Sequence, residues 1–300
     1  MFNYILLFAS VILNTSSVAL SKLYQMRSGA NFRYGVKYNL ISGTVSALAA
    51  AAAIIISGGV MQLTWYSVLM AMIIALSSGA QYIVSFKAFE SGGIVTYVIF
   101  STLGSIFIPS LCGFAFLKES ISMIKWIGFA VLTLAVVFVG NEKSDGKKTD
   151  TILRRKLFFC FMAFLLSGLT GWFSKLHQAD IGMAAVSLES FALLVAIGRA
   201  LIFGVVLICL SFGKQENNVK ESLSAGAFTV AVASALASGV AYIFVLSNAS
   251  ALPAAVMFPV STGGSLVLSA LTGRMFFRER LSRRMIVGLI LAVAAVCMFF

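Results

Sequence analysis

The chain is divided into ten apolar stretches, each about as long as a membrane-spanning helix, with short polar segments between them. A helix needs about 20 mostly apolar residues to cross the hydrocarbon core of a bilayer. Hydrophobic residues make up 60% of the sequence and charged residues only 11%, whereas a soluble domain carries about 25% charged residues. The sequence therefore predicts an all-α membrane protein with ten transmembrane helices, near residues 3–22, 36–57, 66–88, 93–116, 121–140, 154–174, 183–211, 222–247, 252–274 and 284–300.

The basic residues are concentrated in alternate loops. If the N-terminus lies outside, eighteen Lys and Arg residues, Lys22 among them, fall in inner loops, three fall in outer loops, and Arg199 lies within a span. Such an excess is the usual signal for the cytoplasmic side. We therefore expect a multi-pass protein of the bacterial inner (cell) membrane with both termini outside. The net charge of +12 is assigned to this topology signal, so we expect no nucleic-acid partner.

The two halves of the chain resemble each other at constant spacings. At 160 residues, Gly113–Ser122 aligns without gaps with Gly273–Ser282, which pairs Glu119 with Glu279. At 153 residues, Ser21-Lys22 pairs with Ser174-Lys175. Since each copy holds five spans, an odd number, the second copy must enter the membrane from the opposite face. The sequence predicts two inverted five-helix repeats, an arrangement that recurs in transporters, at 1–140 and 154–300, joined by a polar cytoplasmic linker at 141–153.

Small residues recur at every fourth position in the third and eighth spans. Such stripes allow helix backbones to approach closely inside a membrane. Because the stripe occurs in both copies, we expect close helix contacts at Ser67, Ala71, Ala75, Gly79 and at Ala227, Ala231, Ala235, Gly239.

Charged residues inside spans are costly and are therefore functional candidates. Arg199 is a candidate contact for an anionic substrate group, although its side chain can also reach a backbone carbonyl or a lipid headgroup. Glu189 is a candidate for proton coupling, since burial favours the protonated carboxyl; an interfacial carboxylate is the alternative. Lys175 is a third candidate because it opposes the charge bias, with extension to the interface as its alternative.

Aromatic and hydroxyl side chains deep in the spans suit a cavity for an amphipathic solute. Anchoring at the interface and ordinary packing explain any single one of them equally well. The candidates of this type are Tyr82, Tyr97, Ser101, Thr102 and Tyr242.

Catalytic and metal-binding motifs were not found. The four cysteines each lie in an apolar stretch, and the single histidine, His177, excludes a multi-histidine metal site. There is no HExxH motif and no glycine-rich phosphate loop. We expect no enzyme activity and no cofactor. A lipid-modifying enzyme would need clustered His, Asp or Glu at the interface, and a scaffold without transport activity would need a soluble domain or long tail.

The chain resembles the drug/metabolite transporter superfamily over essentially its whole length, and within it the EamA-type branch. The matching segments are Ser21-Lys22 and Ser174-Lys175 at the ends of the first and sixth spans, and Phe116–Glu119 and Phe276–Glu279 before the last span of each copy. The tryptophan often found before the lysine is present in the second copy only, as Trp172.

The resemblance implies a central cavity surrounded by spans one, three, four, six, eight and nine. It supports Tyr82, Ser101 and Tyr242 and adds Ser261. It implies a secondary transporter or facilitator that moves a small amphipathic metabolite, such as an amino acid or a drug-like solute, by alternating access. The expected partners are this solute, membrane lipid and coupled protons. The direction of transport and the formation of a homodimer stay open.

Overall fold

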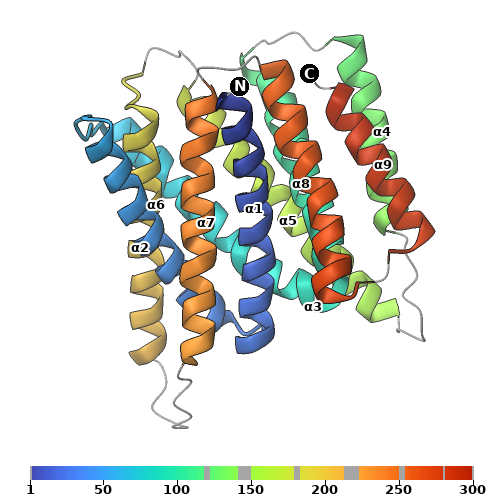
Figure 1. Cartoon of the computed structure of the whole chain (residues 1–300), viewed down its shortest axis with the longest axis horizontal. Coiled ribbons are helices and arrows are strands. Elements are labelled where there is room, and N and C mark those ends of the chain that lie inside the picture. The colour runs from blue at the N-terminus through green and yellow to red at the C-terminus, as the bar shows by residue number, and fades with distance from the viewer. Residues whose placement is uncertain are drawn as a thin grey trace.

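The chain forms a bundle of helices that run roughly side by side (Figure 1). The computed structural model describes residues 2–117, 122–140, 150–178, 183–212, 223–249, 254–279 and 281–298. Within these ranges the helices are α1 (Phe2–Ser28), α2 (Phe32–Ile56), α3 (Trp65–Leu117), α4 (Met123–Gly140), α5 (Asp150–Gln178), α6 (Leu188–Phe212), α7 (Ala225–Ala249), α8 (Ala254–Phe277) and α9 (Arg283–Met298).

Helix α3 accounts for two of the expected spans. It has 53 residues and contains the apolar segments Trp65–Glu90 and Ile94–Phe116. Gln81 Nε2 donates a hydrogen bond to Ser101 Oγ at 2.8 Å, whereas a straight helix would separate these residues by roughly 30 Å. Helix α3 therefore reverses direction between its two segments, and Gln81 holds the two limbs together.

The all-α, multi-pass membrane character predicted from the sequence is confirmed. In the described residues, seven helical segments are long and apolar enough to cross a bilayer. One boundary differs from the expectation: α5 begins at Asp150, so the last four residues of the expected linker 141–153 are helical. Residues 141–149 lie outside the described residues.

Polar groups are buried between the helices while large apolar side chains face outward. Asn39 and Ser234 are fully buried, whereas Ile5 and Ile290 are about 60% exposed. Tyr38 and Ser17 each bond to the Ser234 hydroxyl, with oxygen–oxygen distances of 2.7 and 3.1 Å. This distribution suits lipid as the solvent, because polar groups in a bilayer must find their partners inside the protein.

The most extensive helix contacts are α3 with α5, α1 with α7, α2 with α6 and α4 with α9. The small-residue stripe of the third span lies where α3 meets α6, with Ala71 and Ala75 buried and Gly198 against Ala75. Gly239 in the second stripe lies against Ala49 of α2. Small residues thus set the helix separation at equivalent places in the two halves.

Gly104 lies at a close approach of α3 and α5. A Cβ atom added there would overlap the backbone carbonyl of Phe164, whereas one added at Gly204 would make an ordinary contact of 3.6 Å with Leu40. We expect Gly104→Ala to destabilise the fold by about 1–3 kcal/mol, the usual range for overpacking, and Gly204→Ala to have little effect. Denaturant unfolding in detergent micelles measures both. Equal stability of the two variants would contradict this packing.

Candidate functional site

A cavity of about 240 Å³ lies at the centre of the bundle and is lined by residues of α1, α3, α6 and α8. A second cavity of about 150 Å³ adjoins it and is lined by α1, α7 and α8. The two share Asn14 and Ser265. Ligand pockets usually measure about 300–1,000 Å³, so this space suits a small molecule.

Most of the candidate residues from the sequence line these two cavities. The larger cavity brings together Tyr82, Tyr97, Ser101, Thr102 and Arg199. The smaller one holds Tyr242 and Ser261.

Lys175 and Glu189 line neither cavity. Lys175 lies in the last turn of α5 and Glu189 in the first turn of α6. Glu189 is nevertheless near enough to interact electrostatically with Tyr242, which lines the smaller cavity. Of these two residues, Glu189 is therefore connected to the smaller cavity only through its interaction with Tyr242.

Arg199 brings a positive charge to the wall of the larger cavity. It is the twelfth of the 25 residues of α6, close to the middle of the helix. Its Nη2 atom donates a hydrogen bond to Ser78 Oγ at 2.8 Å, and its Cζ atom lies 5.4 Å from the centre of the Tyr82 ring. Both contacts come from the first limb of α3, and they hold the guanidinium beside the cavity.

Sequence reasoning missed several neutral polar residues of the wall. Gln81 donates to Ser101 Oγ at 2.8 Å and to the Tyr97 hydroxyl at 3.3 Å. Asn14 and Thr15 line the cavity from the middle of α1, and Ser265 and Ser269 line it from α8. The available signal was a side-chain amide inside an apolar run, which in a membrane needs an internal partner much as a charge does.

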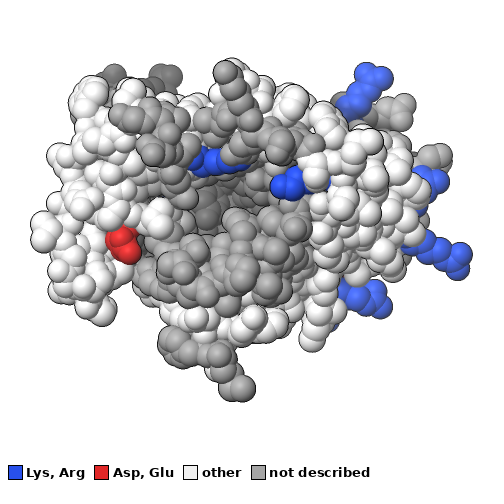
Figure 2. Space-filling view, turned by 90° about the horizontal axis from the view of Figure 1, so that it is seen from above, with Lys and Arg blue, Asp and Glu red and all other residues white. Residues whose placement is uncertain are grey.

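One face of the molecule is hollowed at its centre (Figure 2). It is the face at which α1 begins and α9 ends (Figure 1). Basic side chains lie at the edge of the hollow (Figure 2).

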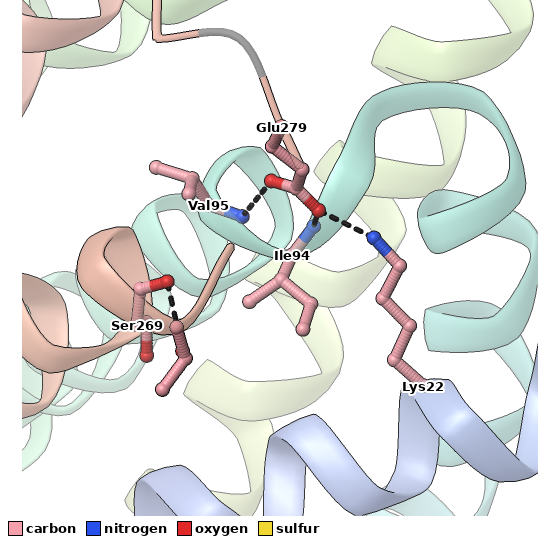
Figure 3. A network of polar contacts seen from close by, with 6 residues as sticks. Lys22, Ile94, Val95, Ser269 and Glu279 are labelled. Atoms are coloured by element: carbon pink, nitrogen blue, oxygen red, sulfur yellow. Dashed lines mark hydrogen bonds and ion pairs between the residues drawn. The ribbon is translucent and has the colours of Figure 1, made fainter. Parts of the chain in front are cut away.

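On the opposite side, Lys22 and Glu279 form a buried ion pair (Figure 3). The Lys22 and Glu279 side chains are only 10% and 13% exposed. The carboxylate also accepts hydrogen bonds from the backbone amides of Ile94, at 2.7 Å, and Val95, at 3.4 Å. Lys22 Nζ lies 4.5 Å from the centre of the Phe277 ring. The expectation that Lys22 is an ordinary inner-loop cation was wrong, because its ammonium is paired inside the protein.

The turn after α8 places Glu279. Helix α8 ends at Phe277, and Arg278 has the positive φ of 52° that often ends a helix. The Glu279 amide then donates back to the Gly273 carbonyl at 3.0 Å. A Cβ atom at Gly273 would lie 3.0 Å from both Glu279 Oε2 and Val95 Cγ2, so glycine leaves room for the carboxylate. Glu279 thereby joins α1, the loop before α9 and the start of the second limb of α3.

Comparison with known proteins identifies the fold alone. No family model and no curated protein matches this chain. A solved structure described as "Crystal structure of protein" superposes with a TM-score of 0.61 at 14% identity, covering 96% of this chain and 95% of its own. The chain thus adopts a fold already seen in a protein of closely similar length.

The Lys22–Glu279 pair should make a large contribution to the free energy of unfolding. We expect Lys22→Met or Glu279→Gln alone to cost about 3–5 kcal/mol, because each leaves polar partners buried without compensation. The double variant should lose about 1–3 kcal/mol less than the sum of the two, measured by denaturant unfolding in micelles. As a control, Glu90→Gln should change little, since the Glu90 side chain is 56% exposed and its Oε2 atom lies 3.6 Å from Lys87 Nζ, and exposed ion pairs add little stability. Additive losses would contradict a direct pair.

Proposed function

We propose that this protein is a secondary transporter or facilitator of the EamA-type branch of the drug/metabolite transporter superfamily. It moves a small amphipathic metabolite, such as an amino acid or a drug-like solute, across the bacterial inner membrane by alternating access. Three features taken together carry this proposal. A polar cavity lies at the centre of the membrane-spanning bundle, one face of the bundle is hollowed (Figure 2), and the Lys22–Glu279 pair joins the helices on the other side.

Polar lining at the centre of an apolar bundle favours a solute pathway over a structural core. Intramembrane polar groups are costly and usually mark substrate or ion routes. The larger cavity has aromatic rings from Tyr82 and Tyr97, hydroxyls from Ser101 and Thr102, and the guanidinium of Arg199. These groups suit a solute with one apolar part and one polar part, which is what an amphipathic metabolite offers.

The pattern of helix contacts supports two inverted repeats. In the two proposed repeats, α1 corresponds to α5, α2 to α6, and the first limb of α3 to α7. Exchanging the repeats therefore turns the contact of α1 with α7 into that of α3 with α5. It likewise turns the contact of α2 with α7 into that of α3 with α6, and all four contacts are present. The pairs α2–α6 and α4–α9 map onto themselves. Helices α1 and α5, which open the two halves, cross the bundle in opposite directions (Figure 1). Such symmetry provides two related conformations, one open to each side.

The ion pair also links the two sequence segments that carry the family resemblance. Lys22 closes the first span, and Glu279 belongs to the segment before the last span; the two are 257 residues apart. Lys175, the counterpart of Lys22 in the second repeat, lies at the end of α5. Glu119, the counterpart of Glu279 in the first repeat, lies outside the described residues. A contact that ties one repeat to the other on one side is what a rocking motion must break in order to open that side.

Transport can be measured with the full chain reconstituted in proteoliposomes, using amino acids, sugars and cationic dyes. We expect at least one solute class to cross faster than in protein-free vesicles. Glu189→Gln should keep downhill exchange but lose accumulation driven by a pH gradient, because glutamine cannot bind and release a proton. Glu90→Gln, an exposed carboxylate, is the matched control and should keep both.

Two outcomes would contradict these roles. If no solute crosses faster than in empty vesicles, the protein is not a transporter of these classes. If Glu189→Gln accumulates solute as the unmodified chain does, Glu189 is not the coupling residue.

A further inference from the structure

The larger cavity has an unbalanced charge. Arg199 is the one charged residue among those described around it, and no Asp or Glu lines it. Two other described carboxylates are engaged elsewhere, Glu279 with Lys22 and Glu90 with Lys87. Glu189 lies ten residues before Arg199 on the same helix, which places it roughly 15 Å away. The structure therefore leaves a positive charge in the middle of the membrane without a carboxylate beside it.

The guanidinium of Arg199 is only partly satisfied. An arginine side chain has five N–H donors, and to the described residues Arg199 makes one hydrogen bond, from Nη2 to Ser78. Its Nε atom is buried and has no hydrogen-bond partner among them. The Tyr82 ring offers a cation–π contact at 5.4 Å, which is worth less than a carboxylate in a desolvated site. Arg199 is held in place by α3 and keeps donors for a further anionic partner.

A second polar atom of the wall is also unpaired. Thr15 is only 4% exposed, and its Oγ1 atom is buried without a hydrogen-bond partner in the described residues. Thr15 lines the cavity from α1 together with Asn14, while Arg199 lines it from α6. Buried polar atoms without partners are rare in proteins. Two of those among the described residues, Arg199 Nε and Thr15 Oγ1, belong to side chains that line this one cavity from different helices.

We infer that this cavity binds a small monoanionic carboxylate, with the carboxylate on Arg199 and hydroxyl or keto groups of the solute near Thr15 and Asn14. This inference deepens the proposed transport function and rests on it for the claim that the bound acid is carried across the membrane. One guanidinium compensates one negative charge in its planar, two-point geometry. The ammonium group of an amino acid would meet no acidic side chain in the described wall, so an acid without an amino group is preferred.

The size of the site limits the solute. The cavity of about 240 Å³ opens toward the neighbouring one of about 150 Å³ through their common residues, Asn14 and Ser265. The smaller space, lined by Tyr242, Ser261 and Ser238, can hold an aromatic or short aliphatic tail. A hydroxy or keto acid with a compact tail fits this pair of spaces, whereas a bulky dye does not.

Binding can be tested on the purified full chain through its thermal unfolding, since a ligand that binds the folded state raises the midpoint. The probes are two matched series, phenyllactate with its amide, phenylalanine and phenethylamine, and lactate with its amide and alanine. Inorganic phosphate is a further anion. We expect at least one acid to bind about 10–100-fold more tightly than its amide, the range of a charge-assisted hydrogen bond.

The variants identify the residue responsible. Arg199→Gln should weaken binding of the acid by the same factor and leave the weak binding of the amide unchanged. Arg199→Lys should bind the acid more tightly than Arg199→Gln does but less tightly than the unmodified chain, because lysine keeps the charge without the planar guanidinium. Arg274→Gln removes an exposed arginine near the end of α8 and should bind as the unmodified chain does. The unfolding midpoint of each variant without ligand shows whether it has folded.

Several results would overturn the inference. These are amide binding as tight as that of the acid, preference for phosphate or for the amino acid, undiminished binding by Arg199→Gln, or no shift with any acid. The proposed function is judged separately, by uptake of the same probes into proteoliposomes. An acid that binds through Arg199 without being carried supports the binding site and contradicts transport. If Arg199→Gln carries a neutral solute as well as the unmodified chain does, transport is supported and the binding site is contradicted.

Discussion

The ion pair between Lys22 and Glu279 is the contact on which the architecture depends. It joins the end of α1 to the loop before α9, and through the amides of Ile94 and Val95 it also holds the start of the second limb of α3. A buried carboxylate is tolerable only when cations and donors surround it. Here α1 and the second limb of α3 supply them to a carboxylate carried by a third segment, the loop before α9. Replacing either charge would leave the other without its partner, so the three segments are held together or released together.

The rest of the bundle follows from the absence of water in the bilayer core. Polar side chains are turned inward, where Ser17, Tyr38 and Ser234 satisfy one another. Small residues bring helices together where no hydrophobic force drives association: Gly104 faces the backbone of Phe164, and Gly79 leaves room for the Phe203 ring. This internal pairing is incomplete at several described residues, and two of them, Arg199 and Thr15, line the central cavity. Under the proposed function, a bound solute supplies a further partner for the Arg199 guanidinium.

Much of the fold was predictable because lipid imposes simple rules on sequence. The lengths of the apolar stretches located the helices to within a few residues, since every span must cross the same thickness. Polar and aromatic groups inside spans are rare, which made them candidates, and seven of them line the two cavities: Tyr82, Tyr97, Ser101, Thr102, Arg199, Tyr242 and Ser261. Their contact with a solute stays a prediction. The turn within α3 was expected between residues 88 and 93, although the helix is continuous there.

Other features depend on contacts that the order of residues does not reveal. The pairing of Lys22 with Glu279 spans 257 residues, and the sequence offered Lys22 only as one loop cation among many. Gln81 and Asn14 carry no charge, so neither stood out against the apolar background. Lys175 attracted attention because its charge opposes the topology bias, yet it lies in the last turn of α5 and lines neither cavity. Tertiary geometry decides which of several similar polar residues meet.

Accessibility of the cavity from each face tests alternating access most directly. In a variant without the native cysteines, Ser101→Cys can be labelled with a membrane-impermeant maleimide applied to one side at a time. We expect rapid reaction from the face where α1 begins and slow reaction from the other face, with Glu279→Gln accelerating the second reaction and slowing the first. Ala163→Cys, fully buried between helices, should stay unlabelled throughout. If Glu279→Gln leaves both rates unchanged, the ion pair does not control access and a carrier that rocks about this cavity is contradicted.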